Sequence, residues 1–189
     1  MRKAQFVALC AVMTFGLVSL VSSRGEQGQS APAASAIRVG TFDSRAVAVA
    51  SASSRTFNDA IRKVMDEHKQ AKAAGDQKRV AEIEAAQSTK QALLHRQGFG
   101  TASVADILEH VKDKLPAVAE RAGVEVIVSK WDVVYRKAGI QPVDVTDAMV
   151  ALFDPNERVL AIVKDMKDKP PLTLKEIEQG EESEKREHR

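Results

Sequence analysis

The sequence predicts a mainly α fold with a small β-sheet, an α+β class in which a long antiparallel helical hairpin projects as an arm from a small β-containing body. Three observations support this prediction. A heptad stripe of mostly apolar residues runs from Val47 to Ala71. A break at Gly75 and Asp76 separates this stripe from a second helical stretch. A single dense run of β-branched residues, 124–128, lies nearer the C-terminus.

The N-terminus has the pattern of a secretory signal peptide. Arg2 and Lys3 precede an apolar stretch of about 16 residues, 6–21, which is short for a spanning helix of roughly 20 residues. We place cleavage after Ser23, so residues 1–23 form the signal peptide and residues 24–36 a flexible linker. The alternative is an uncleaved membrane anchor, and membrane association is expected only in that case.

Composition and charge argue against several classes of protein. The whole chain has a net charge of +2, and removing the signal peptide with Arg2 and Lys3 leaves a neutral chain, which argues against nucleic-acid binding. The only cysteine, Cys10, lies in the apolar stretch, so the mature chain can form no disulfide. An aromatic content of 4% predicts packing through small aliphatic side chains on helices.

The predicted arm covers about residues 46–97. Its first helix follows Asp43 and Ser44, which suit an N-cap, and carries a stripe whose spacings alternate between three and four residues. We expect one continuous helix of roughly 28 residues, about 40 Å long. A second helix over 77–96 must run antiparallel to the first because the turn is so short. The stripe includes Val47, Ala50, Ser54, Phe57, Ile61, Val64, His68 and Ala71.

The predicted body covers residues 37–45 and 98–166. Residues 37–42 form a strand, and residues 124–128 pair with a second short strand at 133–135. Glycines around Phe99 interrupt the returning helix, and Pro116 should kink or restart the helix that follows. Two further helices are expected at 147–153 and 154–166, with Asp154 as the N-cap of the second. The charged tail, 167–189, is expected to be disordered.

Three short strands form a sheet too small to be stable alone, so copies of the body are expected to pack together. The arm then projects outward from this shared base. The residues assigned to the oligomerisation body are Val39, Phe42, Val124, Val126, Val128, Val134 and Tyr135.

The order of these features resembles the Skp/OmpH family of periplasmic chaperones over about residues 37–153. The matching motifs are a strand ending in Phe42-Asp43, the helical hairpin, the strand pair ending in Tyr135, and the cap and helix that begin at 144–146. The resemblance implies a periplasmic homotrimer whose helical arms enclose a cavity. It also implies that this cavity holds unfolded outer-membrane or exported proteins without ATP. The arm here is shorter and less basic than is usual in that family, with nine Lys or Arg against six Asp or Glu over 55–96.

No pattern in the sequence indicates catalysis, a metal site or a cofactor. His68, His95 and His110 are spread over three predicted helices without matched carboxylates or cysteine. We therefore expect a non-enzymatic protein that binds clients near the tip of the arm. The alternative is a coiled-coil structural or adaptor protein of the cell envelope that tethers partners through its charged tail or through an uncleaved N-terminus. The candidate client-binding residues are Met65, Lys69, Lys72, Lys78 and Arg79.

Overall fold

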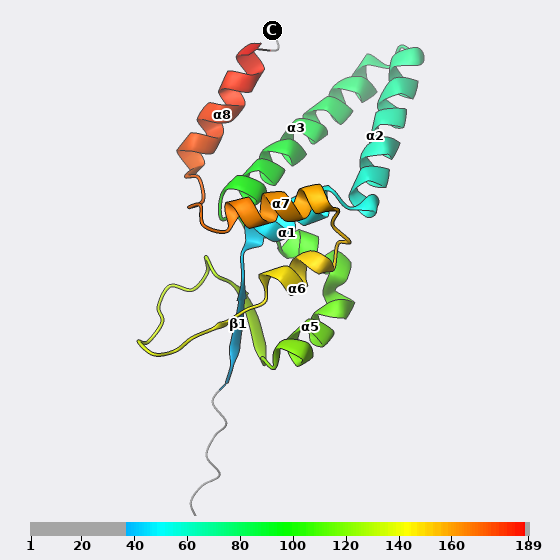
Figure 1. Cartoon of the computed structure of the whole chain (residues 1–189). Helices are drawn as coiled ribbons and strands as arrows, with labels where there is room; N and C mark the ends of the chain where they lie inside the picture. Colours follow the sequence, from blue (N-terminus) through cyan, green and yellow to red (C-terminus); the bar gives the residue numbers. More distant parts are fainter. Residues whose placement is uncertain (1–36, 188–189) are drawn as a thin grey trace, which may run out of the picture. The chain divides into compact units, whose positions relative to one another are not determined.

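The computed structural model describes residues 37–187 (Figure 1). The predicted signal peptide and the linker up to residue 36 lie outside the described residues. The strands are β1 (Val39–Phe42), β2 (Val126–Ser129) and β3 (Val143–Asp144). The α-helices, together with one 3-10 helix labelled η1, are α1 (Ser44–Ala52), α2 (Arg55–Ala73), α3 (Gln77–Phe99), α4 (Ala105–Leu108), η1 (Glu109–Lys114), α5 (Leu115–Ala122), α6 (Thr146–Ala151), α7 (Glu157–Met166) and α8 (Leu174–Glu187). The predicted α+β class is confirmed.

The sheet is parallel, with the strand order β2-β1-β3. Val39 pairs with Val126, and Gly40 pairs with both Ile127 and Val143. The predicted strand at 133–135 is wrong, because this segment lies in an exposed loop between β2 and β3. The strand β2 is parallel to β1 and continues into that loop, so the third strand comes from residues beyond it.

Helix α1 belongs to the core of the domain. It contacts α3, α6 and α7 and contributes the fully buried side chains of Val47 and Ala50. Four alanines in its nine residues let these neighbours approach closely. The core continues through buried apolar residues of α4, η1, α5, α6 and α7. The predicted continuous helix over 46–73 is therefore wrong, because its first third is packed inside the body.

The helix breaks at Ser53 and Ser54, and the two hydroxyl groups account for the break. Ser53 Oγ donates to Ala50 O at 2.8 Å at the end of α1, and Ser54 Oγ accepts from Phe57 N at 3.2 Å at the start of α2. Serine favours such bonds to nearby backbone groups over the helix interior. Ser54 is thus an N-cap rather than a member of a continuous apolar stripe.

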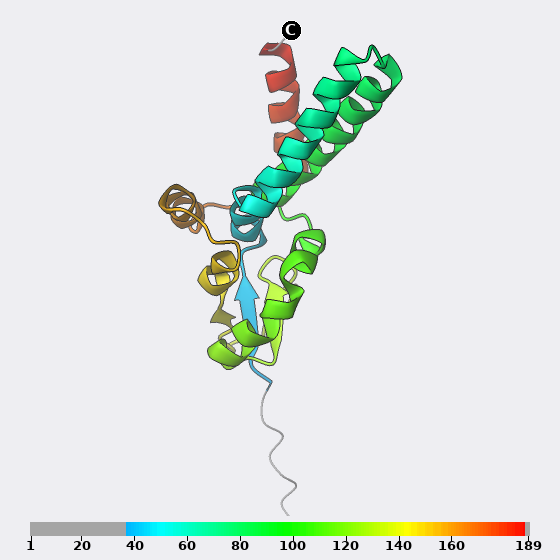
Figure 2. The same ribbon diagram turned by 90° about the vertical axis from the view of Figure 1, so that its right-hand side faces the viewer.

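Helices α2 and α3 lie side by side and antiparallel, joined by a tight turn (Figures 1 and 2). Gly75 has φ 71°, the left-handed conformation that glycine tolerates best, and Asp76 accepts from Arg79 N at 2.9 Å as the N-cap of α3. Both predictions for this turn are confirmed. Few apolar side chains of the two helices are buried, and these are Ala71, Val80 and Ile83.

The chain returns to the sheet through α4, η1 and α5. Helix α3 continues through Gly98 and ends at Gly100, so the predicted glycine break is a helix end. Pro116 lies in the first turn of α5, as expected of a restarted helix, and Gly123 ends α5 with φ 62°. Helix α7 is capped by Asn156, which accepts from Val159 N at 3.0 Å, and not by the predicted Asp154.

The tail is also corrected by the structure. Residues 174–187 form the helix α8, which packs on α3 through the buried side chain of Ile177. Leu172 N donates to Phe99 O at 2.8 Å just before this helix begins. The expectation of a mostly disordered tail over 167–189 is therefore wrong for residues 174–187. Apolar residues at 172, 174 and 177 were too few to indicate a packed helix by periodicity.

Candidate binding groove

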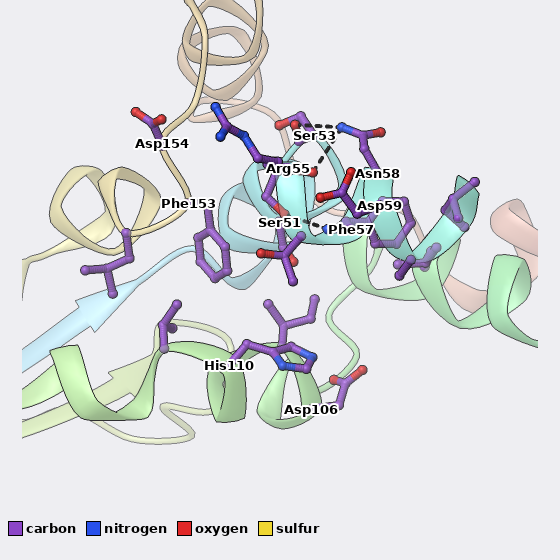
Figure 3. A pocket seen from close by; sticks show the side chains of 18 of the residues that line it. Ser51, Ser53, Arg55, Phe57, Asn58, Asp59, Asp106, His110, Phe153 and Asp154 are labelled. Atoms are coloured by element: carbon purple, nitrogen blue, oxygen red, sulfur yellow. Dashed lines mark hydrogen bonds between the residues drawn. The ribbon is translucent and has the colours of Figure 1, made fainter. Parts of the chain in front are cut away.

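A half-open groove of about 1270 Å³, here called the hairpin groove, lies beside the α2–α3 hairpin (Figure 3). Its walls come from α2, the middle of α3, the α4–η1 segment and the turn after α6. It is the feature of this structure best suited to binding. Its main apolar lining residues are Phe57, Ile61, Met65, Leu94, Ile107, Val111, Leu152 and Phe153.

Helical spacing produces one apolar wall. Phe57, Ile61 and Met65 follow one another at four-residue intervals and therefore lie on one face of α2. Phe57 and Ile61 are half-buried, whereas Met65 is 65% exposed. The opposite wall is formed by α4 and η1, where Ile107 and Val111 reach into the core. The groove thus has one wall that belongs to the core and an exposed methionine at its edge.

The rim of the groove is charged and nearly balanced. Figure 3 shows His110 and Asp106 on one wall, facing Arg55 and Asn58 on the other. Lys90 Nζ lies 5.2 Å from the centre of the Phe57 ring, a cation–π arrangement that covers part of the aromatic face. The rim cations are Arg55, Arg62, Lys90 and Lys114, and the rim carboxylates are Asp59, Asp106 and Asp154.

One rim residue is fixed by a buried partner. Gln97, which is fully buried, donates through Nε2 to Asp106 Oδ1 at 2.7 Å and to Ser103 O at 2.8 Å. These two bonds hold the start of α4 against the end of α3. The α4–η1 wall is therefore anchored to α3 at this end of the groove.

The groove has the chemistry of a binding surface for apolar and mixed side chains. Between residues 37 and 187, no group of three His, Asp or Glu side chains is arranged to bind a metal. Methionine and long cationic side chains can repack around different partners, which favours tolerant recognition over one fixed ligand pose.

The structure separates the predicted client-binding residues into two places. Met65 lines the hairpin groove, whereas Lys69, Lys72, Lys78 and Arg79 lie on exposed surface towards the α2–α3 turn. Arg79 is already paired with Glu67 at 3.2 Å and with Glu82 at 3.3 Å. Two carboxylates of the hairpin therefore already neutralise part of the charge of Arg79. Of the five predicted client-binding residues, only Met65 lines the groove.

The structure also separates the residues predicted for the oligomerisation body into buried, half-buried and exposed ones. Phe42 and Val124 are buried in the core of their own chain, so as folded they offer no surface to another copy. Val39 and Val128 are half-buried in the sheet, and Val126 is 41% exposed at its edge strand. Val134 and Tyr135 are the most exposed, at 99% and 82%. They lie in the loop 131–142, here called the apolar loop, together with exposed Val133 and Ile140.

A buried ionic cluster stands at the carboxyl end of β1. Asp43, 3% exposed, receives hydrogen bonds from Arg45 at 2.8 and 3.1 Å and from Trp131 Nε1 at 3.1 Å, and it pairs with Lys130 Nζ at 2.8 Å. Arg45 also donates to Met166 O at 3.1 Å and to Lys169 O at 2.9 Å. This Asp43 cluster ties the sheet to the end of α7. Its polar atoms already have partners, which identifies it as a structural element.

The cluster determines how stability should respond to acid. Burial raises the pKa of Asp43, but the hydrogen bonds from Arg45, Lys130 and Trp131 outweigh burial and lower the pKa to about 2. The ordinary value is 3.8, so the folded state favours the ionised form by on the order of 2 kcal/mol. That contribution is complete above about pH 5 and is lost as the pH falls through 3.8 towards 2.

We therefore expect the free energy of unfolding to fall between pH 5 and pH 2. In Asp43→Asn the part of this fall that Asp43 causes should disappear. Urea titrations at a series of pH values measure this difference, with Asp59→Asn, an exposed groove carboxylate, as the matched control. Equal pH slopes in Asp43→Asn and the wild type would contradict the assignment.

The α4–η1 wall of the groove was not predictable from the sequence. Ile107 and Val111 fall in the segment 98–166, which the sequence assigns wholly to the body. His110 and Phe153 carried no signal of their own, because nothing in the sequence indicates that residues 106–114 and 152–154 face α2. Within the stripe from Val47 to Ile61, the polar Ser54 is the one sign in the sequence that α1 and α2 are separate helices.

Comparisons with protein-family models, with curated proteins and with solved structures found no match to this chain. The class of protein that the structure defines is an α+β domain with a parallel three-stranded sheet and a paired α2–α3 hairpin beside a half-open groove. Within the described range 37–187, none of the helices combines the length and apolar character needed to cross a membrane.

Proposed function

We propose that this protein is an ATP-independent periplasmic holdase that keeps unfolded outer-membrane or exported proteins from aggregating. The observation that carries this proposal is the hairpin groove, which is large, half-open, and lined by apolar side chains with a nearly balanced charged rim. Such a surface suits segments of unfolded chain, in which apolar side chains alternate with charges of either sign. The α2–α3 hairpin then acts as the projecting arm.

The apolar loop supports assembly into a homotrimer. Its segment 133–135 has the composition of a β-strand, yet in the single chain it has no strand partner and Val134 is 99% exposed. Pairing with another copy would satisfy its backbone groups and cover Val134, Tyr135 and Ile140. The number three comes from the resemblance to the Skp/OmpH family. In a trimer of this kind, the three hairpins would surround a shared client space.

Weak contacts at many positions explain how such a protein releases its clients without ATP. Each exposed ion pair or aliphatic contact contributes little alone, about 1 kcal/mol or less for a surface pair. Lys69, Lys72 and Lys78 near the α2–α3 turn add positive charge without fixing one pose. A client that folds buries its own apolar segments and therefore leaves the groove by mass action.

The first test is suppression of aggregation by the chain from residue 24 onward. The protein should keep several unrelated denatured proteins soluble at near-stoichiometric ratios without ATP, as measured by light scattering. Met65→Asp places a carboxylate at the edge of the groove and is expected to weaken this suppression by about five- to thirtyfold, since one apolar contact is worth about 1–2 kcal/mol. Ile162→Asp is the matched control, because Ile162 is 43% exposed on α7 and lies outside the groove.

The competing function is that of a coiled-coil adaptor in the cell envelope. The folded and largely exposed α8 favours it, because a charged helix is a suitable tether for one partner. An adaptor should leave the aggregation of unrelated proteins unchanged and should capture a single partner through residues 167–189. Failure of the wild type to suppress aggregation of any client would therefore reject the holdase and favour the adaptor.

A further inference from the structure

The C-terminal helix α8 is acidic, short and poorly suited to stand alone. It has 14 residues, and its sequence contains three Lys or Arg and six Glu, a net charge of −3. Isolated helices below about 12–15 residues are marginal in water even with favourable sequences. The folded form of α8 therefore depends on its contacts with the rest of the domain.

Three contacts hold α8 against the end of α3: one backbone hydrogen bond, one buried aliphatic side chain and one carboxylate–histidine contact. Leu172 N donates to Phe99 O at 2.8 Å, and the side chain of Ile177 is buried against the end of α3. Glu181 Oε1 lies 3.2 Å from His95 Nδ1, with both side chains mostly covered. Ile177 and Glu181 are four residues apart, so they lie on the same face of α8. Leu174 on the same helix remains 56% exposed.

The surface beneath α8 is complementary to these contacts in shape and in charge. Gly100 has no side chain, and a Cβ placed there would lie 3.0 Å from Ile177 Cδ1. The ring of Phe99, which is 51% exposed, lies with its centre 5.6 Å from that of the His95 ring and is tilted by 51° to it. The α2–α3 hairpin carries nine Lys or Arg against six Asp or Glu over 55–96, which complements the charge of α8. We call the surface formed by His95, Phe99 and Gly100 the α8 site.

We propose that α8 is a tethered competitor for the α8 site, and that this site also accepts acidic amphipathic segments of the protein's clients. The proposal rests on the proposed holdase function and adds a second contact and a client preference to it. Such a segment would reproduce the three contacts of α8. It would offer a backbone N–H to Phe99 O, an aliphatic side chain to Gly100 and a carboxylate to His95. A docked α8 keeps the site closed, and a client opens it by displacement.

The test uses a fluorescently labelled peptide of residues 172–189 and three chains from residue 24 onward, which include all the described residues, 37–187. The chains are the wild type, Ile177→Asp and the matched control Leu174→Asp. In Ile177→Asp the tethered helix no longer fits its site, so the peptide should bind at least tenfold more tightly than to the other two chains. Fluorescence anisotropy measures the affinity, and circular dichroism verifies that all three chains fold.

Competition by a client completes the test. A denatured client with acidic amphipathic segments should displace the peptide from Ile177→Asp, whereas a client with only basic segments should displace it at least threefold less well. Equal peptide affinity for the three chains would overturn the proposal. So would failure of a client that has acidic amphipathic segments, and that the wild type keeps soluble, to displace the peptide. Peptide binding requires no holdase activity, so its outcome is distinguishable from failure of the aggregation assay.

Discussion

Replacement of Arg45 by methionine is expected to lower the free energy of unfolding by about 3–5 kcal/mol, because it leaves a buried carboxylate without its main partner. Arg45 is 3% exposed and donates to Asp43, to Met166 O and to Lys169 O. Its removal therefore takes a donor away from Lys169 O and leaves Met166 O with its bond from Lys169 N, and it also weakens the Asp43 cluster. Urea denaturation at pH 7 gives the change directly.

Two further variants sharpen this prediction. Arg62→Met removes an exposed arginine of α2 at the groove rim and should change stability by less than about 0.5 kcal/mol. The double variant Asp43→Asn with Arg45→Met removes both buried charges and should recover part of the loss, since an unpaired charge costs more than a missing pair. An Arg45→Met variant as stable as Arg62→Met would show that the cluster contributes little.

Substitution of Val134 and Tyr135 by aspartate is expected to abolish assembly and, with it, most of the holdase activity. Both side chains are exposed in the single chain, so the substitutions should leave the fold of each subunit intact. Burying two carboxylates in a contact between copies would cost several kcal/mol, enough to dissociate a small interface. Light scattering on a sizing column should show the mass falling from that of a trimer to that of one chain.

The control for this experiment is Ile162→Asp, which also replaces an exposed apolar side chain by a carboxylate, but on α7. It should retain the mass and the activity of the wild type. If the wild-type chain is monomeric over a wide concentration range, the proposal that three hairpins surround a shared client space is contradicted. Loss of activity in the Val134 and Tyr135 variant without a change in mass would instead make the apolar loop a direct client contact.

The parts of the fold that local chemistry determines were predictable from the sequence. Two residues define the α2–α3 turn. Asp76 accepts a hydrogen bond from the backbone N–H of Arg79, and Gly75 tolerates a left-handed conformation. Gly123 ends α5 for the same conformational reason, and Pro116 marks its beginning. Each of these signals acts within a few residues, so no knowledge of the tertiary structure was needed.

The parts that depend on distant contacts were not predictable. The stripe from Val47 to Ala71 keeps its period through Ser54, and periodicity cannot reveal that the chain changes direction there. The strand β3 has only two residues, Val143 and Asp144, and becomes a strand because Gly40 and Thr41 pair with it. The hairpin groove likewise requires residues 57–65 and 106–111 to face each other, which the fold alone decides.

The parallel sheet also constrains when the domain can form. The central strand β1 comes first in the chain, but its partners in β2 and β3 lie about 90 and 100 residues later, as the pairs Val39–Val126 and Gly40–Val143 show. Non-local pairing of this kind slows folding relative to local helix contacts. The α2–α3 hairpin can therefore form early, whereas the core cannot close until residue 143 has been synthesised. A newly made chain stays open for most of its synthesis, a state compatible with export before folding.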